Sequence, residues 1–308
     1  MTNAKSVGIL GAGAWGASLA NLAAANGHRV RVWSRQGSQT LQAALEDVQI
    51  VLSAISMIGV RDVASQVQSF PLSPETIFVT ATKGLDPQTT CTPSQIWQTV
   101  FPNHAVVVLS GPNLSKEIQM KLPAATVVAS NIPTAAEVVQ LVFSSQRFRV
   151  YTNPDPLGVE LGGTLKNVIA IAAGVCDGLQ LGTNAKAALV TRGLTEMVRI
   201  GNDWGAKTET FYGLSGLGDL LATCNSPLSR NYQVGYQLAH GKSLREILEN
   251  LQGTAEGVNT CRVLMQRGKQ QNIAIPITEQ VYQLLQGEIT PRQALDELML
   301  RDIKPEYN

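Results

Sequence analysis

The chain contains 308 residues, of which 44% are hydrophobic and 15% are charged, and its formal net charge at pH 7 is +1. This length allows about two domains of ordinary size, and the composition supports a large buried core and argues against a disordered chain. Because the net charge is close to zero, no overall electrostatic attraction to nucleic acid or to an anionic membrane surface is expected.

The first half of the chain alternates short apolar segments with helical patterns. Seven segments have the nearly continuous apolar character of strands that are buried on both faces of a sheet: 7–10, 29–33, 49–55, 76–82, 105–109, 125–129 and 147–151. Helical patterns lie between several of them, for example at 17–26 and 94–100. The alternation predicts an α/β fold, a doubly wound Rossmann-like sheet with a largely parallel core, in a dinucleotide-binding domain of residues 1–153.

The first predicted strand is followed by Gly11, Gly13 and Gly16 in the spacing Gly-x-Gly-x-x-Gly, and then by a helix. The motif alone is weak evidence, but between a strand and a helix, with a second strand to follow, it is typical of a dinucleotide site. Gly11 permits a tight turn, Gly13 lets backbone N–H groups approach a pyrophosphate, and Gly16 lets the helix pack close to the strand. The helix N-terminus then offers free N–H donors and a partial positive charge to the phosphates.

The end of the second predicted strand bears on the choice of cofactor. NAD-specific sites usually place an acidic residue there to bind the ribose 2′-hydroxyl. This chain has Trp33-Ser34-Arg35 instead, and Arg35 and Ser34 suit a 2′-phosphate. We therefore expect NADP(H) to be preferred and NAD(H) to be tolerated; the alternative is that Arg35 is simply a solvated side chain.

The pattern changes at Asn153-Pro154-Asp155-Pro156, where two prolines in three residues interrupt the chain. Beyond them we find almost no strand-like alternation. Long helical patterns occur instead, at 158–174, 185–203, 230–240, 244–251, 257–270, 277–286 and 290–299. Residues 154–308 are therefore expected to form a second, all-helical domain that binds substrate and carries the catalytic group.

The four cysteines and three histidines are scattered, and no pair has the spacing of a metal site. We expect no metal and no disulfide scaffold, so reduced cysteines are the default. The N-terminus does not resemble a secretory leader, and no stretch approaches the ~20 apolar residues of a membrane helix. These features predict a soluble, cytoplasmic protein that interacts with neither nucleic acid nor membrane.

Further motifs extend over nearly the whole chain. They are TATKGLD at 80–86, LSGPN at 109–113, ELGGTLKNVIAIAAG at 160–174, GLGDLLATC at 216–224 and LSRN at 228–231. By these segments the chain resembles the bacterial-type NAD(P)-dependent glycerol-3-phosphate dehydrogenases. The Lys-Asn pair and the Gly-Asp-Leu and Ser-Arg-Asn segments, in this order, are specific to that family among Rossmann enzymes.

The resemblance implies hydride transfer between NAD(P)H and dihydroxyacetone phosphate, giving sn-glycerol 3-phosphate for phospholipid synthesis, and it allows a homodimer. It implies that Lys166 is the catalytic lysine. The residues that it implies for substrate binding are Lys83, Gly111, Asn113, Lys166, Asp219, Ser229, Arg230 and Asn231. Those implied for the cofactor are Gly11, Gly13, Ala14, Trp15, Gly16, Arg35, Lys83, Ser115, Arg230, Thr254 and Glu256.

The chemistry supports these roles independently. Hydride reduction of a ketone leaves an alkoxide, which needs a proton and a positive field. Lys166 precedes an Ala/Ile/Val-rich helical stretch, where burial would lower a lysine pKa toward neutrality, and Asp219 would balance or orient its ammonium group. Ser229 is a predicted helix N-cap, and Arg230 beside it offers a planar match to phosphate oxygens.

Simpler interpretations remain open for some residues. Asp219 would also serve as a helix cap after Gly-Leu-Gly, and Glu256 as a first-turn charge. Thr223 and Cys224 suit the core as well as they suit the site. We assign no chemistry to Cys176 or to the histidines.

Two features depart from the family pattern. Most relatives carry a substantial insertion between the second and third strands, whereas residues 35–48 here hold only one short predicted helix at 40–46. The Pro-Ser pair usual after the third strand is replaced by Ile55-Ser56-Met57-Ile58. Both changes affect the adenine pocket and the cofactor preference more than the reaction.

Two other functions compete with this one. A related two-domain dehydrogenase, of the β-hydroxyacid dehydrogenase or ketopantoate reductase type, also combines a Rossmann domain with a helix-borne lysine. The Ser229-Arg230-Asn231 segment favours a phosphorylated substrate over these. A redox sensor that binds NAD(P) without turnover is the second alternative, and the presence of Lys166 and Asp219 argues against it.

Overall fold

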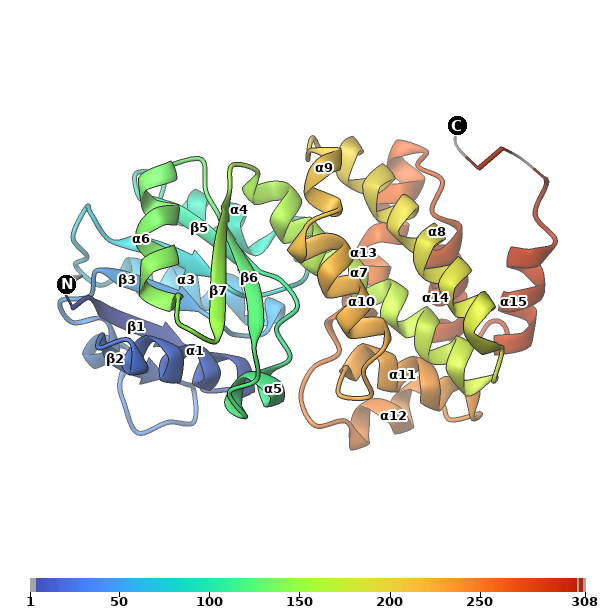
Figure 1. Ribbon diagram of the computed structural model, residues 1–308, viewed down its shortest axis with the longest axis horizontal. Helices are drawn as coiled ribbons and strands as arrows, with labels where there is room; N and C mark the ends of the chain where they lie inside the picture. Colours follow the sequence, from blue (N-terminus) through green and yellow to red (C-terminus); the bar gives the residue numbers. More distant parts are fainter. Residues whose placement is uncertain (1–3, 304, 307–308) are drawn as a thin grey trace.

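A seven-stranded sheet forms the N-terminal half of the computed structural model, which describes residues 4–303 and 305–306, and packed helices form the C-terminal half (Figure 1). The strand order is β2-β1-β3-β4-β5-β6-β7, and every neighbouring pair is parallel except β5 and β6. The predicted doubly wound, largely parallel sheet is therefore confirmed. The strands are β1 Ser6–Leu10, β2 Arg29–Trp33, β3 Ile50–Ser53, β4 Ile77–Thr80, β5 Val106–Ser110, β6 Ala124–Ala129 and β7 Phe148–Asn153.

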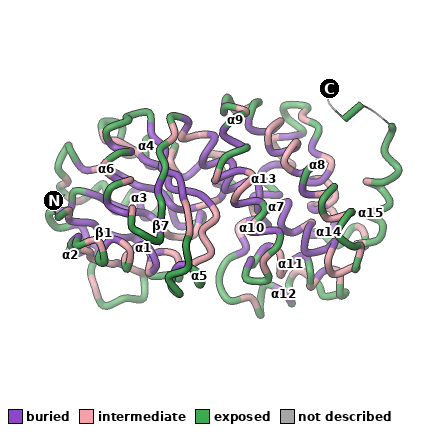
Figure 2. Tube along the Cα trace, in the orientation of Figure 1, coloured by how far each residue is buried: buried purple, intermediate pink, exposed green. Residues whose placement is uncertain are grey.

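Helices cover both faces of this sheet, which explains the continuous apolar strands. In β3, Ile50 and Leu52 pack with α1 and α6, whereas Val51 between them points to the other face and packs with α2, α3 and α4. The two faces thus carry two separate cores, and buried residues follow the middle of the sheet (Figure 2). The covering elements are α1 Ala14–Ala25, α2 Leu41–Leu45, the 3-10 turn η1 Met57–Gly59, α3 Val60–Gln68, α4 Pro93–Val100, α5 Ser115–Gln119 and α6 Pro133–Phe143.

The sheet order places a crevice between β1 and β3. The chain leaves β1 toward β2 on one side and later continues from β3 toward β4 on the other. In open α/β sheets a ligand binds where the strand order reverses, outside the carboxyl ends of the strands. The glycine turn after β1, Arg35 after β2, Met57 after β3 and Lys83 after β4 all lie at these ends.

The described residues after β7 form helices and turns but no strand, as expected from the sequence. The helix α7, Pro156–Gly178, runs through the centre and packs against α8, α10, α11, α13 and α14. The remaining elements are α8 Gly182–Asp203, α9 Thr208–Phe211, the π-helical turn η2 Leu214–Gly218, α10 Asp219–Cys224, α11 Arg230–Ala239, α12 Leu244–Asn250, α13 Glu256–Gln271, α14 Pro276–Gln286 and α15 Pro291–Met299.

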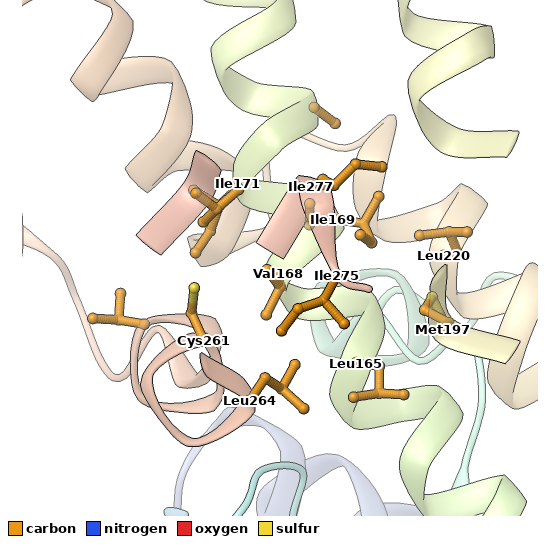
Figure 3. Packing of buried hydrophobic residues seen from close by; sticks show 14 of the residues in the cluster. Leu165, Val168, Ile169, Ile171, Met197, Leu220, Cys261, Leu264, Ile275 and Ile277 are labelled. Carbon is orange, nitrogen blue, oxygen red and sulfur yellow. The ribbon is translucent and has the colours of Figure 1, made fainter. Parts of the chain in front are cut away.

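The apolar side chains of α7 form the core of this half. Leu165, Val168 and Ile169 lie against Leu264 of α13 and Met197 of α8, together with side chains from α10 and α14 (Figure 3). By length and composition alone α7 would be long and apolar enough to cross a membrane, contrary to the expectation from the sequence that no stretch is. Its most apolar window is 94% buried inside the protein, so α7 is a core helix of the helical half.

Candidate active site

The glycine turn between β1 and α1 has the geometry that a dinucleotide needs. Gly11 has φ +116°, in the region that favours glycine, and a Cβ on Gly16 would lie 1.9 Å from the carbonyl oxygen of Gly11. A Cβ on Gly13 would meet no atom within 4 Å, so the space beside it is open. Helix α1 starts at Ala14, and no side chain caps its N-terminus and no acidic residue lies in its first turn. The turn therefore fits a pyrophosphate, as expected from the sequence.

A cavity of about 250 Å³ lies beside this turn, at the ends of β2 and β3. The guanidinium group of Arg35 borders it and packs against Gly59. Ser115 lies at the start of α5, next to α1, where its carbonyl oxygen is 3.5 Å from the Ser18 hydroxyl. Trp15 is half-buried in the first turn of α1. The lining of the cavity is Gly11, Gly13, Trp33, Ser34, Arg35, Ala54, Ile55, Ser56, Gly59 and Val63.

Three charged side chains from distant parts of the sequence meet between the sheet and the helical half. Lys83 follows β4, Lys166 lies in the middle of α7, and Asp219 is the first residue of α10. Lys83 Nζ is 2.5 Å from Asp219 Oδ2, and Lys166 Nζ is 3.1 Å from Oδ1 of the same carboxylate. Lys166 and Asp219 are buried. One carboxylate thus balances two ammonium groups, and the cluster keeps a surplus positive charge.

Thr223 completes the cluster. Lys166 Nζ donates a hydrogen bond of 2.5 Å to the Thr223 hydroxyl, which in turn donates to Asp219 Oδ1 at 3.2 Å. The sequence left Thr223 between core and site, although it follows Asp219 by four residues and so shares its helix face. The alternative role of Asp219 as a helix cap is wrong: the N-cap of α10 is Gly218, and no side chain caps it.

The environment of Lys166 makes its ammonium group a ready proton donor. Burial removes water from the charged form and lowers the pKa of Lys166 to about 8; the nearby charge of Lys83 lowers it as well, while Asp219 opposes both effects. A group with this pKa can donate a proton near neutral pH and can also take one back. The lowering of the pKa agrees in direction with the expectation from the apolar neighbours in the sequence.

The turn after β5 lies against this cluster. Lys83 Nζ donates a second hydrogen bond, of 3.2 Å, to the carbonyl oxygen of Gly111. Asn113 Nδ2 donates to the Thr126 hydroxyl at 2.9 Å, and within the described part of the chain Asn113 Oδ1 is buried without a partner. The structure therefore brings Gly111 next to Lys83, and it leaves an acceptor on Asn113 unused.

The start of α11 holds the Ser-Arg-Asn segment. Ser229 is the N-cap, as predicted, since its side chain accepts a hydrogen bond from Tyr232 N. Asn231 Oδ1 accepts from Gly257 N at 2.9 Å and so ties α11 to the start of α13. Arg230 is exposed, packs against Gly253 and donates to the Thr254 carbonyl oxygen at 3.5 Å. Of the three side chains, Arg230 is therefore the one most available to an anion.

Glu256 connects the helical half to the cofactor side of the sheet. Its Oε1 accepts a hydrogen bond of 3.1 Å from Met57 N, which follows β3. Burial raises the pKa of Glu256, and the hydrogen bond from Met57 and the charge of Arg230 oppose that rise. Glu256 thus contacts η1 rather than acting only as a first-turn charge of α13, a contact that the sequence did not reveal.

Family models cover most of the chain. A model described as the NAD-dependent glycerol-3-phosphate dehydrogenase N-terminus matches residues 6–40 and 36–136, and one described as the C-terminus of the same enzymes matches residues 155–296. A protein from Trichormus variabilis named glycerol-3-phosphate dehydrogenase, NAD(P)+, is 83% identical over 300 residues, which are 97% of this chain and 98% of the relative. One from Nostoc sp. with the same name is 81% identical over 302 residues, or 98% of each chain.

Solved structures agree with these matches. The crystal structure of a glycerol-3-phosphate dehydrogenase from Coxiella burnetii is 34% identical, has a TM-score of 0.93 and covers 97% of this chain and 99% of its own. A ketopantoate reductase from Ralstonia eutropha is 13% identical, with a TM-score of 0.58 over 96% of this chain and 99% of its own. That second likeness concerns the fold alone.

Proposed function

The chain belongs to the family of NAD-dependent glycerol-3-phosphate dehydrogenases, and on this basis we propose that it transfers a hydride reversibly between NAD(P)H and dihydroxyacetone phosphate, with Lys166 as proton donor and acceptor. It is an NAD(P)-dependent oxidoreductase that acts on a small phosphorylated substrate. The role of Lys166 is inferred from its buried ammonium group, which pairs with Asp219 and donates a hydrogen bond to Thr223. Its pKa is lowered to about 8.

A nicotinamide cofactor held by the glycine turn of Gly11, Gly13 and Gly16 would supply the hydride for carbon 2 of the ketone, whose oxygen would then need a proton. Lys166 Nζ gives that oxygen a proton and remains as a neutral amine, hydrogen-bonded to Thr223. Lys83 keeps a second positive charge beside the developing negative charge, in a site largely closed to water. The sum is ketone plus NAD(P)H plus one proton, giving alcohol plus NAD(P)+, and in the reverse direction the neutral amine of Lys166 takes the proton.

The phosphate of the substrate is assigned to the start of α11. Arg230 offers a planar guanidinium group at a helix N-terminus, where both the backbone N–H groups and the helix dipole favour an anion. Ser229 and Asn231 hold this helix start in place through Tyr232 N and Gly257 N. Gly111, whose carbonyl oxygen accepts a hydrogen bond from Lys83 Nζ, and Asn113 in the same turn are assigned to the rest of the substrate.

NADP(H) is the preferred cofactor in this proposal. Arg35 borders the cavity beside the glycine turn together with Ser34, and neither brings a negative charge that would repel a 2′-phosphate. The other assigned cofactor contacts divide into two groups. Ala14, Trp15 and Ser115 surround the turn, and Lys83, Arg230, Thr254 and Glu256 lie toward the helical half.

The wider role follows from the product. We assign the enzyme to the cytoplasm, where the free cysteines Cys91, Cys176, Cys224 and Cys261 would remain reduced, and to the supply of glycerol 3-phosphate for phospholipids. A homodimer is the proposed assembly. We place the domain boundary after Asn153, because β7 ends there and α7 begins at Pro156.

The test is the rate at which the purified protein oxidises NADPH and NADH, followed at 340 nm, with dihydroxyacetone phosphate as substrate. Ketopantoate and unphosphorylated dihydroxyacetone are the controls. Fast oxidation that requires the phosphate, and that is faster with NADPH at low cofactor concentration, is expected. Turnover of ketopantoate alone would overturn the proposed reaction, and equal kcat/KM for both cofactors would overturn the proposed preference.

A further inference from the structure

The peptide that carries Lys83 is held by the helical half of the molecule. Gly84 N donates a buried hydrogen bond of 3.1 Å to the Thr164 hydroxyl on α7, and Asn259 Nδ2 of α13 donates to the Leu85 carbonyl oxygen at 2.9 Å. Thr164 has no exposed surface. The two residues that follow Lys83 are thus fixed on two helices that are distant in sequence.

We call the contacts of Thr164 with Gly84 and of Asn259 with Leu85 the clamp. They directly affect where the Lys83 ammonium group lies. Lys83 Nζ reaches the Asp219 carboxylate at 2.5 Å and the Gly111 carbonyl oxygen at 3.2 Å, and both contacts depend on the position of its backbone. Thr164 lies two residues before Lys166 in α7. One helix therefore positions both ammonium groups of the cluster, Lys166 by carrying it and Lys83 through the bond to Gly84.

We propose that Thr164, assisted by Asn259, is a positioning residue that holds Lys83 on Asp219 beside Lys166 and thereby sets the pH range of the reaction. The ionisable groups that face Lys166 are Asp219 and Cys224 of α10 and Lys83 after β4. The Cys224 thiol stays neutral because burial raises its pKa to about 12. Lys83 and Asp219 are therefore the charges through which the clamp acts.

The direction of the effect can be derived from these charges. If Lys83 moves away, a like charge leaves the surroundings of Lys166 and Asp219 is free to pair with Lys166 alone. Both changes favour the ammonium form, so the pKa of Lys166 rises. Because the ketone is reduced by the protonated lysine, the decline of kcat/KM at alkaline pH then occurs at a higher pH.

The experiment compares Thr164→Val with the wild type. Valine keeps the shape of the side chain but removes the acceptor for Gly84 N. We expect kcat/KM for dihydroxyacetone phosphate to fall roughly 10- to 100-fold, because the reacting groups are misplaced. We expect the alkaline midpoint to move up by about half a pH unit or more, as the like charge is displaced. Thr164→Ser keeps the hydroxyl, so its alkaline midpoint should stay at the wild-type value. Asn259→Ala should move the midpoint in the same direction as Thr164→Val.

Thr278→Val is the matched control, because it removes another buried hydroxyl, one that donates to Glu196 in a different part of the helical half. It should lower the unfolding temperature without moving the midpoint. Thr164→Val should also produce no further shift in a Lys83→Met background, since its effect passes through Lys83. The proposal is overturned if the alkaline midpoint of kcat/KM is unchanged in both Thr164→Val and Asn259→Ala. It is also overturned if Thr164→Val shifts this midpoint by the same amount in the Lys83→Met background as in the wild type.

The proposal rests on the assignment of Lys166 as the proton donor, so a second measurement separates the two. The rate at which Lys166 is acetylated in the folded protein across a pH series, followed by peptide mass spectrometry, reports its pKa without any turnover. If the labelling midpoint moves in Thr164→Val while the activity profile stays unchanged, Lys166 is not the proton donor; the clamp then still acts on Lys166, but the proposal that it sets the pH range of the reaction is overturned together with the role of Lys166. A labelling midpoint that stays at its wild-type value would refute the clamp.

Discussion

Replacing Asp219 by Asn tests the charge balance of the active site most directly. The substitution keeps the shape of the side chain and an oxygen that can accept a hydrogen bond, but it removes the one negative charge that two ammonium groups share. With Lys83 still beside it, Lys166 then loses its counter-ion, and the neutral amine is favoured. The pKa of Lys166 must therefore fall below its wild-type value of about 8.

The size of the effect follows from the distance of 3.1 Å between Lys166 Nζ and Asp219 Oδ1. At an effective dielectric constant of about 20, the Coulomb energy over that distance is about 5 kcal/mol, which corresponds to about 4 pKa units. This is an upper limit, because the side-chain amide introduced by Asp219→Asn would still orient its dipole toward the ammonium group. A fall of at least about one unit is expected from the partial loss of this interaction.

The assay is the pH dependence of kcat/KM for the reduction of dihydroxyacetone phosphate, which reports ionisations of the free enzyme. In Asp219→Asn the alkaline decline should begin at a pH at least about one unit lower than in the wild type. Asp203→Asn is the control, since Asp203 pairs with Arg267 at 3.4 Å in a partly exposed pair on α8 and α13. An Asp219→Asn midpoint at or above that of the wild type would refute the electrostatic account of Lys166.

Three further outcomes are expected. Lys166→Ala should abolish turnover while binding of NADPH, measured by fluorescence titration, stays within a few-fold of wild type; loss of binding with the fold intact would count against its role. Arg35→Ala should raise the dissociation constant of NADPH much more than that of NADH, and an equal rise would contradict its assignment to the 2′-phosphate. Burial raises the pKa of Glu160 from 4.5 to about 7, so its carboxyl binds a proton more readily folded than unfolded, and stability should fall as pH rises through that window. The wild type should therefore lose about 3 kcal/mol of its free energy of unfolding across this pH range. Glu160→Gln cannot ionise, so urea unfolding at pH 5 and pH 8 should show no such loss in that variant; a difference between variant and wild type that is the same at both pH values would refute the raised pKa.

The elements that local pattern specifies were predicted well. All seven strands are present close to where the sequence placed them. The inner strands were recognisable because strands buried on two faces have continuous apolar runs. The edge strands β2 and β7 are less apolar and keep exposed or half-buried residues. The turn at Leu214–Gly218 was not predicted, since its π-helical form depends on i→i+5 bonds and on packing against α7 and α9 rather than on residue type. The apolar length of α7 was underestimated because Lys166 and Glu160 interrupt it in the sequence, although both are buried in the fold.

Only those parts of the site that belong to a local sequence motif could be predicted from the sequence. The glycine turn could be assigned from spacing, and Ser229 from the preference of helix N-caps. The contacts of Glu160 with Ser94 and of Glu256 with Met57 could not be predicted, since they join residues that are 66 and 199 positions apart, respectively. A buried carboxylate that binds the N-terminus of a distant helix leaves no periodic trace in either segment. Such long-range contacts connect the helical half to the sheet, and they explain why the clamp on Lys83 appears only in three dimensions.

Two ammonium groups on one carboxylate also explain how a buried site can attract an anion and still release a proton. In the proposed reaction, the surplus charge favours the phosphorylated substrate and the developing alkoxide, while the proximity of Lys83 keeps Lys166 from binding its proton too tightly. The two neighbours of Lys166 therefore act in opposite directions. Removing Asp219 should move the alkaline limit of ketone reduction to lower pH, and displacing Lys83 should move it to higher pH. General loosening of the fold has no reason to produce shifts of opposite sign, so the pair of variants separates electrostatic control from simple loss of structure.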